Sequence, residues 1–191
     1  MSNTNSRMKL KKLHLGCGKD YKKGYINIDF NKNIKADLYC DLEKRFPFKD
    51  NSVEEIFTEG TVEHISKDKI FQFFEECWRV CKKGAKIRIL TNHFTSVWAC
   101  QHLDHRCFFG VDTFGCMGDK ECFNGEKYNK ARFKINKIKL HFFYPKLVKF
   151  GFLTKIPIDW MFNFSRTWQR FMERFQFFGF DGISYELEVV K

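Results

Sequence analysis

The chain has 191 residues, of which 43% are hydrophobic, and this fits one globular domain with a full-sized core. Its 34 Lys and Arg residues outnumber its 23 Asp and Glu residues, and the net charge of +11 favours anionic partners such as nucleic acid, an acidic membrane surface or a phosphorylated compound. Apolar runs stay well short of the roughly 18 residues that a transmembrane helix needs, and the first twelve residues are too polar for a signal peptide. With eight cysteines and no Cys-x-x-Cys pair, we expect a cytoplasmic protein with reduced thiols.

The first half of the chain alternates between apolar strand patterns and one helical pattern. A strand, a helix and a second strand follow one another with short connections over residues 53–92, which is typical of parallel pairing. The predicted strands cover residues 9–15, 25–30, about 36–42, 53–59 and 86–92, and the helix covers 67–81.

The second half is less regular. Residues 93–126 are rich in His, Cys, Gly and Phe and are expected to form an irregular insert in a single domain that spans 1–191. Residues 131–143 alternate, but the apolar phase shifts, so we predict a strand with a bulge or a hairpin that turns at 136–137. An aromatic helix is predicted at about 160–178, packed on the sheet or serving as a lid or membrane contact, and a last strand at 183–191.

The stretch "LHLGCG" at 13–18 predicts a strand followed by a glycine turn, and Asp29 ends the next strand. A dinucleotide fold has a third glycine and a helix whose N-terminus holds the pyrophosphate. Here Tyr21 stands at that third position, and the nine residues 16–24 are too few for a crossover helix of about ten to twelve residues. The turn therefore favours a nucleoside without a phosphate, such as S-adenosylmethionine, over NAD; a plain tight turn is the alternative.

The chain contains the motifs "LHLGCG", "YINIDF", "ADLYCDL", "FPFKDNSVEEIF", "VEHI" and "EECWRVCKKGAKIRIL" in this order. Together they resemble the class I S-adenosylmethionine-dependent methyltransferases of the small type 11 group. The resemblance covers about residues 9–92 and implies a Rossmann-like, mostly parallel seven-stranded α/β sheet with helices on both faces and an antiparallel last strand. It also extends to "HLDHRCFFGVDTF" at 102–114.

Three positions depart from the family pattern. The usual Pro-Gly-Gly turn is Lys83-Gly84-Ala85, Glu55 replaces an Asp, and Gly60 or Thr61 stands where a His often precedes the Glu-His-Ile motif. The last change lies near the expected methyl group.

The resemblance implies a set of cofactor-binding residues at the carboxyl ends of the parallel strands, where ligands of such sheets bind. The glycine turn would face the methionine part, Asp29 the ribose, Asp41 and Leu42 the adenine edge, and Glu59 and Gly60 the methyl group. The predicted set is Gly16, Cys17, Gly18, Asp29, Phe30, Asp41, Leu42, Glu59 and Gly60.

Methyl transfer to a hydroxyl needs a base, for which His is suited at neutral pH. His105 matches the His of the resembling segment and His93 follows the fifth strand, so both are predicted to act as base or substrate binder. The predicted substrate-binding residues are His64, Trp98, His102 and Phe108.

No metal site is predicted. The stretch "CQHLDHRC" at 100–107 holds two Cys and two His, but its spacing matches no common structural zinc pattern.

These observations lead us to expect a methyltransferase that uses S-adenosyl-L-methionine to methylate an O, N or S atom of a small molecule. An RNA methyltransferase is an alternative because residues 127–158 carry nine Lys or Arg, aromatic side chains and no carboxylate. A non-catalytic binding module that retains the fold is the other alternative. The acceptor and the oligomeric state do not follow from these patterns.

Overall fold

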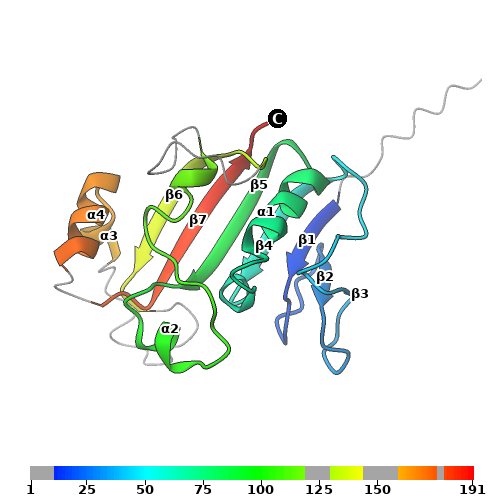
Figure 1. Cartoon of the computed structure of the whole chain (residues 1–191), viewed down its shortest axis with the longest axis horizontal. Helices are drawn as coiled ribbons and strands as arrows, with labels where there is room; N and C mark the ends of the chain where they lie inside the picture. Colours follow the sequence, from blue (N-terminus) through cyan, green and yellow to red (C-terminus); the bar gives the residue numbers. More distant parts are fainter. Residues whose placement is uncertain (1–10, 119–129, 144–158, 176–178) are drawn as a thin grey trace, which may run out of the picture.

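The computed structural model describes residues 11–118, 130–143, 159–175 and 179–191. A seven-stranded sheet with the strand order β3-β2-β1-β4-β5-β7-β6 runs through the molecule (Figure 1). Only β7 runs antiparallel to its neighbours, so the predicted mostly parallel sheet with an antiparallel last strand is confirmed. The strands are β1 Lys11–Leu15, β2 Ile26–Asp29, β3 Leu38–Tyr39, β4 Val53–Glu59, β5 Cys81–Asn92, β6 Phe133–His141 and β7 Gly182–Val189.

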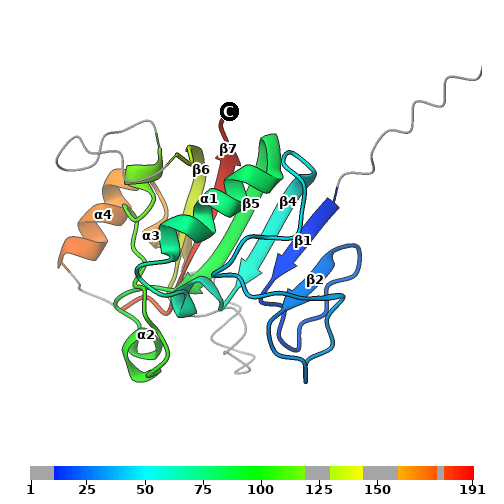
Figure 2. The ribbon, with the colours of Figure 1, turned by 45° about the vertical axis from the view of Figure 1, so that its right-hand side comes forward.

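The helix α1, Ile70–Val80, covers one face of the sheet (Figure 2). Its apolar stripe buries Phe73, Phe74, Cys77 and Val80, which belong to one continuous core with alternate residues of the strands. This packing follows from the i, i+1, i+4, i+7 spacing of those side chains, which places them on one face of the helix. The helix ends at Val80 and β5 begins at Cys81, whereas the apolar run predicts that this strand starts five residues later, at residue 86. None of the described helices combines the length and the hydropathy needed to span a lipid bilayer.

The connection between β1 and β2 contains turns and no helix, as the nine-residue spacing predicts. The strand β6 is continuous and carries a register shift between Ile135 and Lys137 against β7. The phase shift in the sequence is therefore a bulge, and the hairpin alternative is wrong.

The predicted helix at 160–178 is two helices, α3 Asp159–Phe162 and α4 Arg166–Phe175, and residues 176–178 lie outside the described part. The break has a physical cause at the open edge of β6. The Asn163 side chain accepts the Leu140 N–H at 2.8 Å and donates to the Leu140 carbonyl at 2.9 Å, so it pairs with the edge strand as a neighbouring strand would. Gln169 on α4 donates to the Ile138 carbonyl in the same way.

The predicted irregular insert at 93–126 is described as far as residue 118. It contains a short helix, α2 Val97–Gln101, and a 3-10 turn, η2 Gly115–Met117, separated by irregular chain. The remaining residues of the insert, and much of the basic segment 127–158, lie outside the described part.

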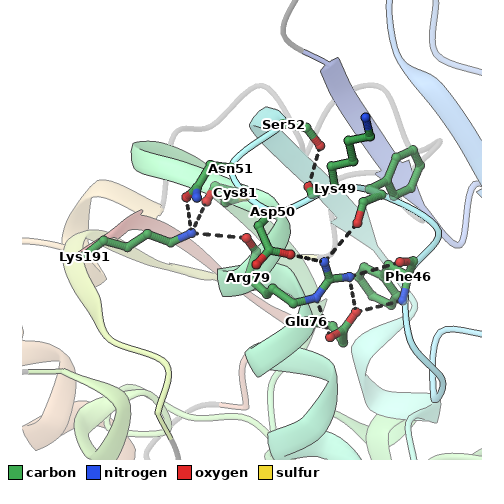
Figure 3. A network of polar contacts seen from close by, with 10 residues as sticks. Phe46, Lys49, Asp50, Asn51, Ser52, Glu76, Arg79, Cys81 and Lys191 are labelled. Carbon is green, nitrogen blue, oxygen red and sulfur yellow. Dashed lines mark hydrogen bonds and ion pairs between the residues drawn. The ribbon is translucent and has the colours of Figure 1, made fainter.

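A network around Arg79 ties two of the family-like motifs together at the amino end of β4 (Figure 3). The guanidinium of Arg79 pairs with Glu76 and Asp50 and donates to the carbonyls of Phe46 and Phe48. The Arg79 guanidinium holds the pKa of Glu76 below its usual range. The Glu-x-x-Arg and Phe-Pro-Phe-x-Asp motifs are thus structural, and they lie at the end of the sheet opposite to the one where a ligand is expected.

Candidate functional site

A cavity of about 750 Å³ lies at the carboxyl ends of β1, β2 and β4. Seven of the nine predicted cofactor residues line it: Gly16, Gly18, Asp29, Phe30, Asp41, Leu42 and Gly60. Cys17 and Glu59 are not among the described residues that line the cavity, although their chain neighbours Gly16, Gly18 and Gly60 are. Cys17 is buried, with its thiol near the Lys35 carbonyl.

The glycine turn is closed by a side chain from the end of β4. Gly16 and Gly18 have φ angles of 62° and 50°, in the left-handed region that disfavours other residues. A Cβ atom on Gly16 would lie 2.2 Å from Oγ1 and 2.4 Å from Cγ2 of Thr61. Thr61 Oγ1 in turn lies within hydrogen-bonding distance of the carbonyls of Glu59 (3.1 Å), Gly16 (3.3 Å) and Leu15 (3.4 Å). The departure from the family pattern at Thr61 therefore fits Gly16, because the two occupy complementary space.

Asp29 is held firmly at the end of β2. Its Oδ2 accepts the Gly18 N–H at 2.8 Å and its Oδ1 accepts the Asn31 N–H at 2.9 Å, while the residue is 7% exposed and lines the cavity. Each carboxylate oxygen can accept a second hydrogen bond. The carboxylate can thus hold the turn and still accept bonds from a ligand hydroxyl.

The opposite wall of the cavity is acidic. The Glu43 N–H and Lys44 hold the pKa of Asp41 below its usual range, and the Ser66 hydroxyl and N–H do the same for Glu43. Both carboxylates are therefore ionised at neutral pH. Lys32 and Arg106 line the same cavity and supply opposite charge.

Three histidines and two carboxylates gather at the far end of the cavity. Glu63 and His64 belong to the 3-10 turn η1, Val62–His64, and His102, Asp104 and His105 follow α2. His64 Nδ1 lies 3.1 Å from Asp104 Oδ2, and the ring centroids of His105 lie 4.7 Å from those of His64 and 4.9 Å from those of His102. Of this group, His64 and Asp104 line the cavity.

The surrounding groups account for the charge of Asp104. A backbone N–H and the nearby imidazoles hold the pKa of Asp104 below its usual range. The structure thus brings together His64 and His102, predicted to bind the substrate, and His105, predicted to be catalytic; these roles stay predictions. Trp98 is 6.1 Å from His102 between ring centroids, whereas Phe108 is half exposed and does not line the cavity.

His93 is the predicted catalytic residue that the structure does not bring to this site. It is 0% exposed, with Nε2 2.7 Å from Glu173 Oε1 and Nδ1 2.7 Å from Thr95 Oγ1. Its ring packs on Phe94 and Phe180. The strand end was located correctly, but Glu173 on α4 draws the side chain into a buried polar network, so we remove His93 from the catalytic set.

Eight lining residues were missed by sequence reasoning: Lys32, Tyr39, Cys40, Glu43, Thr61, Ile65, Asp104 and Arg106. Asp104 and Arg106 flank His105 in the stretch that was already singled out, so proximity in the chain could have found them. Thr61 was noted only as a departure from the family pattern and Glu43 carried no signal, because only the folded chain places them against the glycine turn and η1.

Comparisons with known proteins support this reading of the fold. Residues 16–89 match a family model described as a methyltransferase domain. No protein of curated function matches the sequence. A crystal structure of a SAM-dependent methyltransferase from Archaeoglobus fulgidus is 17% identical, with 95% of this chain and 87% of that chain covered and a TM-score of 0.58.

Two further solved structures have a similar fold. A putative methyltransferase in complex with the Haloferax volcanii Trm112 activator is 15% identical, covers 97% and 86% of the two chains, and has a TM-score of 0.56. Geranyl diphosphate C-methyltransferase from Streptomyces coelicolor A3(2), solved with Mg²⁺, geranyl diphosphate and S-adenosyl-L-homocysteine, is 12% identical, covers 95% and 71%, and has a TM-score of 0.56. At these identities the likeness concerns the fold.

The predicted recognition is confirmed over the matched part of the chain: residues 16–89 match the methyltransferase domain of the type 11 group, whose cofactor is S-adenosyl-L-methionine, and the fold is that of solved SAM-dependent methyltransferases.

Proposed function

We propose that this methyltransferase moves a methyl group from S-adenosyl-L-methionine to an O, N or S atom of a small-molecule acceptor. The sulfonium loses the methyl to the acceptor's lone pair, leaving S-adenosyl-L-homocysteine, and the acceptor's proton passes to a base or to water. The observation that carries the proposal is the single cavity of about 750 Å³, which joins the glycine turn and Asp29 at one end to the histidine cluster at the other. Its size fits a nucleoside and a small acceptor together.

The cofactor would occupy the turn side of the cavity. The turn Gly16–Cys17–Gly18 would contact the methionine part through its backbone, Asp29 and Phe30 would contact the ribose, and Asp41 with Leu42 the adenine. Glu59 and Gly60 would lie beside the methyl group, Glu59 through its backbone.

The acceptor would lie between the methyl group and the histidine cluster. His64 faces the cavity directly, and His105 stands behind it as the base or as a group that holds the acceptor. His102 and Trp98 would form the outer wall. Positioning of the acceptor atom in line with the methyl group is the main requirement of such a displacement.

The cofactor assignment is tested by calorimetry of S-adenosyl-L-homocysteine with Asp29→Asn. Loss of the charged acceptor facing the ribose should weaken binding about 10- to 100-fold. Asp37→Asn is the matched control, because Asp37 also accepts a backbone N–H (from Asn27, 2.8 Å) and a hydroxyl (Tyr21, 2.6 Å) but does not line the cavity. Equal affinities of the two variants would contradict the ribose contact.

The acceptor class is tested by incubating the protein with methyl-labelled cofactor and a cell extract separated by size. Label in the low-mass fraction that survives RNase supports a small-molecule acceptor. Label that RNase releases, with binding that weakens steeply as salt rises, would support the RNA alternative instead.

A further inference from the structure

The far end of the cavity has the composition of a metal site. Among the described residues, two overlapping groups place their ligand atoms within 4.8 Å of one another: Glu63, His64 and His105, and His102, Asp104 and His105. A Zn²⁺ ion about 2 Å from each donor holds its donors roughly 3–4 Å apart, so adjustments on the order of 1 Å would close either group. Cysteine is absent from both groups, although the stretch at 100–107 contains two.

Buried Glu63 provides a second, independent observation. The residue is 2% exposed, and its Oε2 has no hydrogen-bond partner among the described residues. Its Oε1 has a single long contact, 3.4 Å from Asn92 Nδ2. A buried carboxylate oxygen without a partner is costly, and buried charges are normally paired or bound to a metal. A cation at this point would satisfy it.

The histidine at the centre of the cluster is already oriented. His105 Nδ1 lies 3.3 Å from the Ala99 carbonyl, which can only accept, so Nδ1 carries the proton and Nε2 keeps its lone pair. A backbone carbonyl that fixes the second nitrogen is the usual support of a metal-binding histidine. The Glu63 carbonyl also accepts the N–H groups of Arg106 at 2.7 Å and Cys107 at 3.1 Å, so the loop that carries His105 is tied to η1.

We propose that Glu63, His64 and His105 bind a divalent transition-metal ion such as Zn²⁺ at the acceptor end of the cavity. Two imidazoles and one carboxylate suit Zn²⁺ better than Mg²⁺ or Ca²⁺, which prefer oxygen ligands alone. The first group is favoured over the second because it contains the unsatisfied Glu63 oxygen and because His102 and Asp104 are largely exposed.

Three protein ligands leave a position open to the cavity that His64 lines. An oxygen, nitrogen or sulfur atom of the acceptor could occupy it and be held beside the methyl group. This role rests on the proposed function, and it makes His105 a ligand that holds the acceptor through the ion, in place of a base. The ion site itself does not depend on methyl transfer.

The test is titration of the chelator-treated full chain with Co²⁺ alone, followed by displacement with Zn²⁺, with no cofactor present. We expect one ion per chain, visible absorption bands of a nitrogen- and oxygen-bound Co²⁺, and no thiolate-to-cobalt band. Glu63→Gln and His105→Ala should each weaken binding at least about 100-fold, the upper range for loss of one ligand or its support. His102→Ala, the control within the cluster, should change the affinity less than about threefold.

Three results would overturn the proposal: no stoichiometric binding, a thiolate band that places the ion on cysteines, or a site that is lost with His102→Ala and kept with Glu63→Gln. Thermal unfolding of the metal-free variants identifies any that fail to fold, and Glu63→Gln retains the side-chain shape for that reason. Calorimetry with S-adenosyl-L-homocysteine runs in parallel. Intact cofactor binding without metal binding would refute the ion site alone, whereas metal binding without cofactor binding would refute the proposed function alone.

Discussion

Replacing Gly16 by Ala should cost much more stability than replacing Gly18, although both glycines have positive φ angles. Placing Ala in the left-handed region costs about 1–2 kcal/mol, and this cost applies to both positions. At Gly18 a Cβ atom would meet nothing within 4 Å, whereas at Gly16 it would overlap the Thr61 side chain at 2.2 and 2.4 Å. Overpacking of a fitted site adds about 1–3 kcal/mol. We therefore expect a loss of about 1–2 kcal/mol for Gly18→Ala and about 2–5 kcal/mol for Gly16→Ala.

The assay is equilibrium unfolding in urea, followed by tryptophan fluorescence, and it includes Thr61→Ala and the double variant. Thr61→Ala removes the two closest atoms, so the double variant should be more stable than the sum of the single changes predicts, by at least about 1 kcal/mol. The same coupling should be seen in the affinity for S-adenosyl-L-homocysteine. If Gly16→Ala costs no more than Gly18→Ala, or if the two changes add without coupling, then Thr61 does not close the turn as we describe.

Three further predictions concern the scaffold. Arg79→Ala should lower the free energy of unfolding by about 3–5 kcal/mol because it removes the charged partner of the largely buried Glu76 and the donor to the Phe46 and Phe48 carbonyls. Arg88→Ala should cost less than about 1 kcal/mol in the same urea unfolding assay, because the Arg88 side chain is half exposed and its partner Glu55 keeps Lys12 and Tyr25. Burial raises the pKa of Asp159, but bonds from His141, the Phe142 N–H and Lys139 outweigh it and lower the pKa to about 2. Because the ionised form is stabilised in the fold, its contribution is present above the ordinary pKa near 4 and is lost as pH falls towards 2. Asp159→Asn should therefore cost about 1–2 kcal/mol at pH 7 and almost nothing at pH 2, as denaturation at the two pH values would show. Asn163→Ala should cost about 1–3 kcal/mol by leaving the Leu140 N–H and carbonyl at the edge of β6 without their partner, and Asn163→Asp, which can still accept the N–H, should recover part of the loss in the same assay.

The strands and the glycine turn could be predicted because their signals are local. Alternating apolar residues define β5 and β7, and the spacing from Gly16 to Gly24 excludes a crossover helix. For β6 the sequence left two alternatives, a bulge or a hairpin, because a phase shift in the apolar pattern identifies an irregularity but not its geometry.

The errors concern residues whose roles depend on distant partners. The helix expected at 160–178 breaks where Asn163 pairs with the edge of β6, and helical spacing alone contains no information about that edge. His93 follows a parallel strand as predicted, but Glu173, 80 residues later, holds it in the interior. Resemblance to family motifs was also a poor guide to chemistry, because the two motifs around Arg79 support the loop before β4.

The short connection between β1 and β2 explains how this site can dispense with a helix at the turn. In a dinucleotide-binding fold a helix packs against the glycine loop and its N-terminus points at the pyrophosphate. Here the turn is fixed from two other directions: the Asp29 carboxylate accepts the Gly18 N–H, and the Thr61 side chain fills the space that a Cβ on Gly16 would need. Both supports come from strand ends that also line the cavity, so the groups that shape the turn are the ones expected to meet the cofactor. Turn stability and cofactor affinity should therefore change together in variants of Gly16, Asp29 and Thr61, whereas a turn supported by a separate helix would let them vary independently.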